Sequence, residues 1–354
     1  MIHAILIIGH GNHKNILQCI RCIERYNSDP RFKTFIHWDV RSKISETDLE
    51  LLTSTPSVCG IYQELAGNWA SWSLACVTYV LLGNALNYSD TIEHIDYYHI
   101  ISFDSYMLMD PKMFVKFFET APIIGNSIVP HTSKKNRRHD MWAFAKDTYI
   151  KGSLEHHLLW DRFSLDHSAL NNIDQRTCPK EQFNEYLSSL QEQANNNQYI
   201  PDPPFEWYWR SQWASLTDVA ARQVLSAREW IEPYVCKTKF SDETIIATAL
   251  MNSPLKNKVI NAQIMLTAWT AVKDDRRAAD TLDHLTVREI HKIRLSYHPF
   301  LFARKFGNKQ KADNVFLQAV KYYYSKPKKI KILKHTIKNI LSSKSHATDR
   351  KTNR

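Results

Sequence analysis

The sequence predicts an α/β protein with a central, mostly parallel sheet flanked by helices. In the first third of the chain, short apolar runs that suit buried strands alternate with longer stretches of helical periodicity. Three of these runs are each closely followed by a polar residue, namely His10, Asp39 or Asp104. Hydrophobic residues make up 44% of the 354 positions, which is enough for a large packed core.

The expected strands and helices follow from the spacing of apolar residues. Strands are expected at 4–8, 34–38 and 97–101, where apolar and aromatic side chains are nearly continuous. Helices are expected at 16–26, 69–87, 216–226, 243–252 and 287–293, with a last one ending near residue 324. Ligands of parallel sheets bind at the carboxyl ends of the strands, so His10, Asp39 and Asp104 are candidate binding residues.

Residues 152–210 lack this periodicity. The segment is polar and aromatic, with a run of asparagines at 195–197 and the proline-rich run Pro201-Asp202-Pro203-Pro204. A long irregular stretch inside a compact domain is usually a binding loop or a partly disordered insertion. We therefore expect an irregular insertion here.

The positive charge of the chain is concentrated at its C-terminal end. Residues 321–354 hold eleven Lys or Arg and the single acid Asp349, a surplus equal to the whole net charge of +10. From residue 330 onward, Ile and Leu follow helical spacing with lysines between them. This pattern predicts a helix on an anionic membrane surface, with docking on the protein body or disorder as the alternatives.

The calculated pI of about 9.2 raises the alternative of a basic nucleic-acid-binding protein. The charge distribution argues against it, because the body before residue 321 has no surplus with which to neutralise phosphates. The local basic run at 134–138 is the one exception and is interpreted as a solvated loop. The sequence thus predicts no nucleic-acid partner.

The N-terminal residues and the cysteines bear on the compartment. Residues 1–8 lack the basic region of a secretory signal and continue into Gly9-His10-Gly11, which suits a buried first strand. The six cysteines are scattered among apolar neighbours and are expected to be reduced. Together with the basic tail, this predicts a cytoplasmic protein that is peripheral on the inner face of the cytoplasmic membrane.

Two short runs suggest chemistry. Ser241-Asp242-Glu243-Thr244 places an acidic pair at the start of an apolar helix, where Ser241 or Asp242 could cap the helix and Glu243 could accept a proton. The structural alternative is that Glu243 only completes the cap. Phe302-Ala303-Arg304-Lys305-Phe306 holds two adjacent cations between aromatic residues, which suits a diphosphate.

In order along residues 1 to about 310, these runs resemble the core-2/I-branching N-acetylglucosaminyltransferases and peptide O-xylosyltransferases, glycosyltransferase family 14, in a bacterial member. The other matching segments are Ile5-Leu6-Ile7-Ile8-Gly9-His10, Phe35-Ile36-His37-Trp38-Asp39, Trp69-Ala70-Ser71-Trp72-Ser73-Leu74, His99-Ile100-Ile101-Ser102-Phe103-Asp104 and Ser211-Gln212-Trp213-Ala214-Ser215-Leu216. The chain departs from the family at Phe103 and Tyr106, where members carry Gly and Pro, so the acceptor pocket is expected to differ in shape.

The resemblance implies a GT-A type nucleotide-sugar-binding fold over residues 1–320, which inverts the anomeric centre without a metal or other cofactor. The sequence agrees on the metal, because it holds no Asp-x-Asp, the arrangement that commonly presents oxygen ligands to a divalent ion. The implied donor is a UDP-sugar, with N-acetylglucosamine the favoured sugar. The acceptor would be a glycan or lipid-linked glycan in bacterial surface polysaccharide synthesis.

The resemblance also implies roles for individual residues. Glu243 would be the catalytic base, and Lys305, with Arg304 as the weaker candidate, would meet the charge of the diphosphate. The nucleotide-sugar would further contact His10, Asp39 and Trp69, and the acceptor would contact Asp104, Trp213 and Asp242. A further arginine that members use on the diphosphate matches Arg276, Arg277, Arg288 or Arg294 equally well.

Two alternatives stay open at this point. The chain could be a non-catalytic basic nucleic-acid- or carbohydrate-binding protein, in which case Glu243 would be dispensable. Within the expected insertion, Trp207, Tyr208 and Trp209 could stack on sugar rings or simply pack the segment onto the domain.

Overall fold

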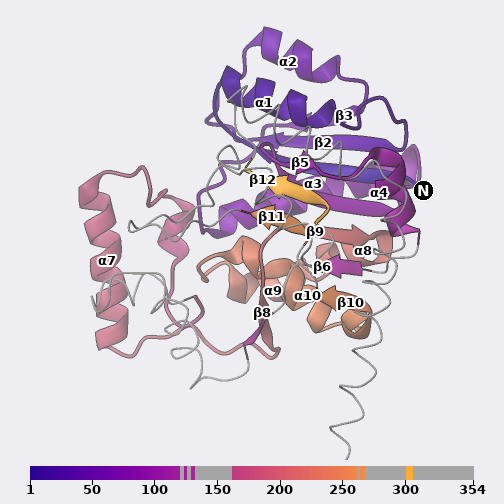
Figure 1. Ribbon diagram of the computed structural model, residues 1–354. Helices are drawn as coiled ribbons and strands as arrows, with labels where there is room; N and C mark the ends of the chain where they lie inside the picture. Colours follow the sequence, from indigo (N-terminus) through magenta and orange to yellow (C-terminus); the bar gives the residue numbers. More distant parts are fainter. Residues whose placement is uncertain (120–122, 126–128, 132–161, 262–263, 268–299, 306–354) are drawn as a thin grey trace, which may run out of the picture.

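The fold is a mixed α/β arrangement with a central, mostly parallel sheet and helices packed around it, which confirms the fold class (Figure 1). A computed structural model describes residues 1–119, 123–125, 129–131, 162–261, 264–267 and 300–305. Within these residues, a seven-stranded sheet has the order β10-β6-β9-β4-β1-β2-β3. A three-stranded sheet, β11-β12-β5, and the pair β7-β8 complete the strands described.

The parallel half of the large sheet follows the pattern of apolar runs. β1 (His3–Gly9) lies between β2 (Phe32–Trp38) and β4 (Tyr97–Ser102), and β3 (Val58–Tyr62) extends the sheet beyond β2, all in parallel. β1 and β4 are buried along almost their whole length, as expected for strands covered on both faces. The three strands predicted from the sequence are therefore confirmed.

Beyond β4 the sheet changes direction. β9 (Ala214–Thr217) runs antiparallel to β4 and to β6 (Ile123–Gly125), and β10 (Val259–Asn261) pairs parallel with β6. Ala214, the first residue of β9, pairs with Ile100 near the end of β4. This reversal carries the residues just before β9 to the carboxyl edge of the parallel strands.

Helices cover the sheet, and polar caps set where several of them begin. The helices described are α1 (His13–Ile23), α2 (Glu46–Thr53), α3 (Trp72–Thr91), α4 (Pro111–Phe118), α7 (Lys180–Asn195), α8 (Asp218–Ser226), α9 (Arg228–Val235) and α10 (Ile245–Met251). The side chains of Asn12, Ser45, Ser71 and Asp110 accept backbone hydrogen bonds at the starts of α1 to α4. The long helix predicted from residue 69 therefore begins only after its cap, Ser71.

The turn after β1 requires its two glycines. A Cβ on Gly9 would lie 2.2 Å from Cε3 of the Trp38 ring, and Gly11 has a φ of +98°, a conformation that favours glycine. The Trp38 indole N–H donates to the Gly11 carbonyl at 3.2 Å. Close packing of β1 against β2 thus fixes the backbone on both sides of His10.

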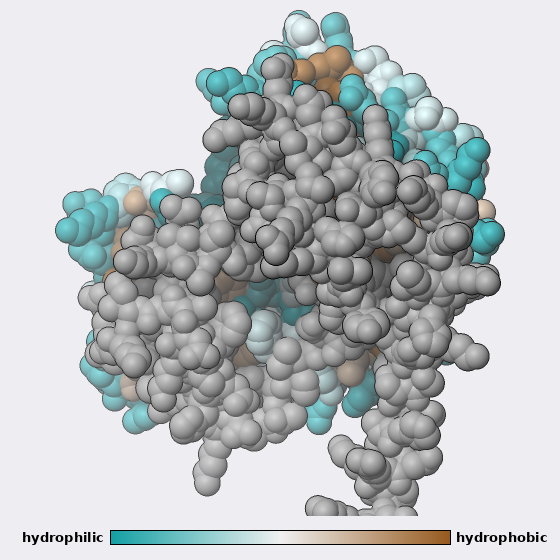
Figure 2. All heavy atoms as spheres, viewed as in Figure 1, coloured by the Kyte–Doolittle hydropathy of each residue, from teal (hydrophilic) through white to brown (hydrophobic). Residues whose placement is uncertain are grey.

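The segment predicted as an irregular insertion is partly regular, and that prediction is wrong for residues 180–195. There α7 buries Tyr186 and Leu190 against Leu165 and Leu170 in a small apolar cluster of its own. The helix buries so little apolar surface that its periodicity is weak among the surrounding polar residues. Figure 1 shows α7 standing apart from the sheet. In Figure 2 only the margin of this region is uncovered, and hydrophilic residues lie at its outer edge beside smaller hydrophobic areas.

Several predictions fall outside the described residues. These are the helix at 287–293, the basic run at 134–138, the four candidate diphosphate arginines and the tail at 321–354. In the described part of the chain, no helix is both long and apolar enough to cross a membrane. The domain boundary at residue 320 and the membrane helix in the tail stay predictions.

Candidate active site

The site begins where the parallel strands end. His10 follows β1, Asp39 follows β2 and Asp104 lies just beyond β4. A segment two hundred residues later joins them, because β12 (Phe302–Arg304) pairs with β11 (Met265–Thr267) and, antiparallel, with β5 (Tyr106–Met107). Ala303 is paired with Tyr106, which brings the C-terminal cation motif beside Asp104.

Arg304 connects the end of β4 to Trp213. Its Nε donates to Ser102 Oγ at 2.7 Å and lies 3.4 Å from Asp104 Oδ1, and Ser102 Oγ also donates to the Asp104 carboxylate. The guanidinium lies over the Trp213 ring, 4.7 Å from its centroid. The structure thus brings together three of the predicted residues: Asp104, Trp213 and Arg304.

Arg210 extends this connection to Glu243. Its Nη1 donates to the Trp213 carbonyl at 3.2 Å, and its backbone N–H donates to the Glu243 carbonyl at 2.9 Å. The residue follows β8 (Trp207–Trp209), and the backbone of that strand is held by Thr248 of α10. Glu243 is therefore fixed relative to the strand edge through Trp213 and Arg210.

The turn that carries Glu243 is strained and is not a helix N-terminus, so the predicted cap is wrong. Ser241–Glu243 forms a 3₁₀ turn, and α10 begins later at Ile245. Ser241 Oγ does not cap α10, because it donates to the carbonyls of Val235 and Thr238. Phe240 has a φ of +58°, which is uncommon for a bulky residue, and such strain clusters at functional sites.

Arg162 is the immediate partner of Glu243. Its guanidinium lies 4.5 Å from the Trp209 ring centroid and 4.4 Å from that of Phe240. Nη1 is 2.7 Å from Glu243 Oε2, in an ion pair that lacks the alignment of a hydrogen bond. Because Arg162 is 7% exposed and held between two rings, it fixes the Glu243 carboxylate in a low-dielectric setting.

Asp242 lies beside this ion pair with an unsatisfied oxygen. The residue is 6% exposed, and its Oδ1 has no hydrogen-bond partner. Burial, together with the neighbouring Glu243 carboxylate, raises the pKa of Asp242 to about 7, against the lowering effect of Arg162. Near neutral pH, Asp242 can therefore hold a proton beside the Glu243 carboxylate.

We expect Asp242→Asn to remove a pH dependence of stability. The folded pKa of about 7 lies above the ordinary value of 3.8, so the native state binds more protons than the unfolded chain between these pH values. The contribution of Asp242 to the free energy of unfolding must then fall as the pH rises from about 4 to about 7. Buried histidines whose pKa is lowered, such as His3 and His99, act in the opposite direction, so the test is the difference between variant and wild type. Chemical denaturation at pH 4.5 and pH 8 should show that the wild type loses stability relative to Asp242→Asn between the two pH values, while the exposed control Asp90→Asn changes in parallel with the wild type. A difference between wild type and Asp242→Asn that is the same at both pH values would contradict the assignment.

His10 keeps an exposed edge at the centre of the strand ends. Burial of the rest of its ring lowers its pKa. Asp104 and Asp39 act in the opposite direction, while Arg176 and Arg304 lower it further. The ring also lies edge-on to Phe103, with centroids 5.2 Å apart. Phe103 is one of the two positions at which the sequence differs from the pattern of family 14. His10 thus lies within electrostatic range of Asp39 and Arg304, two other residues that were predicted to contact the nucleotide-sugar.

The Asp39 carboxylate accepts four hydrogen bonds from other groups of the protein. Oδ1 accepts from the backbone N–H and Nε of Arg41, each at 2.9 Å, and Oδ2 accepts from Arg41 Nη2 at 2.7 Å and from the Gly67 N–H at 2.9 Å. Although burial opposes ionisation, these bonds hold the pKa of Asp39 below its ordinary value. Asp39 therefore orders the loop after β2, and its contact with a nucleotide stays a prediction.

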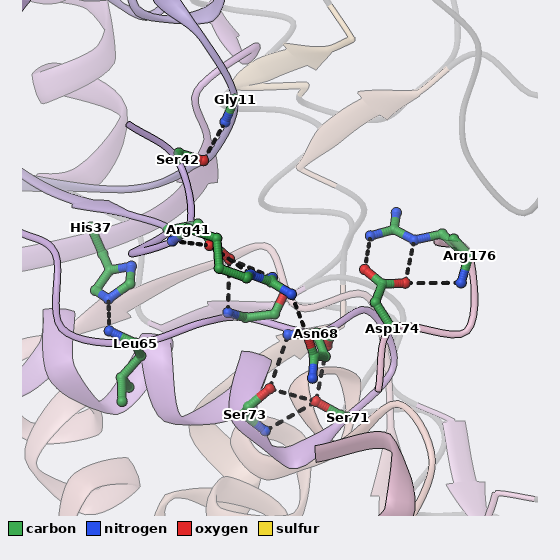
Figure 3. A network of polar contacts seen from close by, with 12 residues as sticks. Gly11, His37, Arg41, Ser42, Leu65, Asn68, Ser71, Ser73, Asp174 and Arg176 are labelled. Atoms are coloured by element: carbon green, nitrogen blue, oxygen red, sulfur yellow. Dashed lines mark hydrogen bonds and ion pairs between the residues drawn. The ribbon is translucent and has the colours of Figure 1, made fainter. Parts of the chain in front are cut away.

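Arg41 begins a polar network that holds the loop containing Trp69 (Figure 3). Its Nη1 donates to Asn68 Oδ1 at 2.7 Å, and Asn68 Nδ2 donates to the carbonyls of Leu170 and Asn171. Trp69 itself lies edge-on to Phe240, and the Arg176 guanidinium lies 5.4 Å from its ring centroid. Trp69 therefore borders the Glu243 turn through Phe240, and its contact with a nucleotide-sugar stays a prediction.

The aromatic run at 207–209 mainly packs the protein. Trp207 and Tyr208 are buried, and Trp207 stacks on Phe163 with centroids 5.0 Å apart. Trp209 is the exception, because it is half-buried and lies under Arg162. Packing is thus confirmed for two of the three residues.

Two residues at the centre of the site, Arg162 and Arg210, were not identified from the sequence. Both lie in or beside the segment predicted as irregular, where no periodicity indicated that a cation would be buried.

Lys305 lies immediately after β12 and is half-buried. Within the described residues no three His, Cys, Asp or Glu side chains gather so that they could hold a metal ion, and the metal independence of the protein stays a prediction.

No protein-family model matches the chain, and neither does any curated protein. Among solved structures, it is similar to core-mannan synthase A (CmsA/Ktr4) from Aspergillus fumigatus in its Mn/GDP form, with 11% identity and a TM-score of 0.31 over 72% of this chain and 71% of that one. The mannosyltransferase Ktr4p from S. cerevisiae in complex with GDP gives 9% identity and a TM-score of 0.31 over 72% and 68%. TarS from S. aureus gives 11% and 0.27 over 38% of this chain and 23% of that one, so the chain spans less than a quarter of TarS. The TM-scores of these three structures lie between 0.27 and 0.31, and their sequence identities lie between 9% and 11%.

Proposed function

We propose that the protein is an inverting, metal-independent glycosyltransferase with a GT-A type fold, which moves a sugar from a UDP-sugar to a carbohydrate acceptor. One observation carries the proposal: a carboxylate, Glu243, on a strained turn is joined through Arg210 and Trp213 to a guanidinium at the carboxyl ends of the parallel strands. A base and a cation that are both linked to Trp213, the cation through the ring and the base through Arg210 and the Trp213 carbonyl, match the two charges that develop in direct displacement at an anomeric carbon.

Glu243 is the proposed base. The acceptor hydroxyl must lose its proton as the new bond forms, and a carboxylate within hydrogen-bond reach typically contributes about 10²–10⁴-fold in rate. Arg162 pairs with Glu243 Oε2, so the carboxylate is oriented before the acceptor binds. Glu243 remains partly exposed, which leaves it accessible to a substrate.

Arg304 and Lys305 are the proposed cations for the leaving diphosphate. As the sugar departs, negative charge grows on the UDP oxygens, and fixed cations stabilise that state more than the ground state. Arg304 is already bonded to Ser102 and close to Asp104, which orients it at the strand edge. Lys305 follows it directly and would add a second positive charge.

We expect transfer, or donor hydrolysis, to persist in excess EDTA. Protein cations would then meet the charge for which other enzymes use a divalent ion. The test screens a panel of UDP-sugars for product by mass spectrometry in EDTA, and again after Mn²⁺ or Mg²⁺ is added. Activity that EDTA abolishes and either metal restores would contradict the metal-independent mechanism while leaving the transferase class intact.

The finer assignments are also part of the proposal. The donor sugar is N-acetylglucosamine, and the acceptor is a glycan or lipid-linked glycan of a bacterial surface polysaccharide, on the strength of the resemblance to family 14. The basic surplus at 321–354 supports a peripheral site on the cytoplasmic membrane. The UDP-sugar screen, repeated with candidate acceptors, tests the first two, and liposome sedimentation tests the third.

A further inference from the structure

Arg210 is a buried cation that forms no ion pair with any acidic residue in the described part of the chain. The residue is 2% exposed, and its single side-chain hydrogen bond runs from Nη1 to the Trp213 carbonyl. Nε and Nη2 have no partner, and in the described part of the chain Arg210 forms no ion pair. Two nitrogen atoms of one guanidinium are therefore left without an acceptor beside the Glu243 turn.

The neighbouring arginines show that this is unusual within the same site. Arg162 is equally buried but faces the Glu243 carboxylate, and Arg304 faces Asp104. Burial lowers the pKa of Arg210 to about 9, so the guanidinium is still charged at neutral pH. A buried charge without a counter-ion is costly, and native proteins satisfy most such groups.

The position of Arg210 indicates which part of a substrate would supply the missing charge. Its backbone N–H is bonded to the backbone carbonyl of Glu243, so Arg210 neighbours in the fold the residue whose side chain would deprotonate the acceptor. Arg304 and Lys305, the proposed diphosphate cations, follow from β12, and Arg304 contacts Trp213 through its ring. Arg210 donates to the Trp213 carbonyl, and its own backbone is bonded to that of Glu243.

We propose that Arg210 binds an oxyanion, a carboxylate or phosphate, on the acceptor, so that this enzyme glycosylates acidic sugars. The inference rests on the proposed function and adds the substrate class. A guanidinium presents a planar fork that matches a carboxylate or phosphate through two parallel hydrogen bonds, and Nε and Nη2 are the unpartnered atoms of such a fork. A neutral sugar would leave the charge uncompensated.

Thermal stability provides the first test, because a buried charge that is retained for ligand binding lowers the stability of the protein when no ligand is bound. Arg210→Met removes the uncompensated charge and one hydrogen bond, so in the absence of ligands its Tm should equal or exceed that of the wild type. The matched control is Arg162→Met, which removes an equally buried arginine but leaves Glu243 without its cation; its Tm should fall. A fall of similar size in Arg210→Met would show that Arg210 is a structural residue and would overturn the proposal.

Ligand-induced shifts of Tm provide the second test, with four probes: methyl β-D-glucuronide, glucose 6-phosphate, methyl β-D-glucoside and UDP. At least one acidic sugar should raise the Tm of the wild type but not of Arg210→Met, and Arg210→Lys should retain part of the shift. Which acidic sugar acts decides between carboxylate and phosphate. The neutral glucoside should have no effect on any variant.

UDP separates the failure of this inference from that of the proposed function. UDP should raise the Tm of the wild type and of Arg210→Met alike. Loss of the UDP shift in Arg210→Met would place Arg210 at the donor and overturn the acceptor assignment, as would acidic sugars that leave the wild type unchanged or shift both proteins equally. If UDP fails to shift the wild type, the proposed donor is wrong, while the acidic-sugar arm still decides what Arg210 binds.

Discussion

Replacing Glu243 by glutamine is expected to lower the rate of transfer by about 10²-fold or more while UDP binds as before. The amide has nearly the shape of the carboxylate and can still approach Arg162, but it cannot accept a proton from the acceptor hydroxyl. Single-turnover kinetics with the donor found in the UDP-sugar screen measure the chemical step, and calorimetry measures the affinity for UDP. Circular dichroism confirms that the fold is kept.

Glu232→Gln is the matched control for this variant. Glu232 pairs with Arg228 one turn earlier on α9, on the surface, so the same chemical change there should leave transfer near that of the wild type. If Glu243→Gln also transfers sugar at the wild-type rate, Glu243 is not the base. The alternative of a carbohydrate-binding protein without catalysis would then become the leading hypothesis.

The sequence was sufficient to predict the parallel half of the sheet. β1, β2 and β4 are nearly continuous apolar runs buried on both faces, and such runs are visible without a structure. The short elements α2, α4 and α9 were not predicted, because eight residues give too little periodicity. α7 was missed for a different reason, since it buries only a few apolar residues against a small separate cluster.

The site was predicted in part, and the features that were missed are properties of the folded chain, such as backbone conformation and burial. Asp104, Trp213, Arg304 and Glu243 lie in or beside strands and a turn that the sequence marked, and tertiary contacts connect them. The predicted cap at Ser241 was wrong because the chain bends at Phe240, whose positive φ cannot be inferred for a phenylalanine.

Arg162 and Arg210 could not have been found by pattern. A lysine or arginine in a polar stretch is normally exposed, and only the fold shows that aromatic rings contact Arg162 and that Arg210 has no counter-ion among the residues described. The same applies to Asp39, whose position after a strand suggested a ligand contact but whose carboxylate accepts three hydrogen bonds from Arg41 in its own loop and one from Gly67 in the loop after β3. Burial and saturation decide these roles, and both are properties of the folded chain.

Lys305→Ala is expected to weaken UDP binding by about 10–100-fold while uridine binds as before. Hydrogen bonds to charged groups contribute about 1.5–3 kcal/mol, and only UDP carries the diphosphate that Lys305 would meet. Calorimetric titration with UDP and with uridine gives the two affinities. Raising the ionic strength should reduce the difference between wild type and variant, because salt screens the charge.

Two further variants make this result specific. Lys180→Ala removes an exposed lysine at the start of α7, away from the strand edge, and should bind both ligands as the wild type does. Arg304→Ala should lose UDP affinity and stability together, because the nearly buried Asp104 would be left without its cation. Equal losses for UDP and uridine in Lys305→Ala would show that Lys305 supports the fold of the site, and the charge of the leaving diphosphate would then have to be met by Arg304.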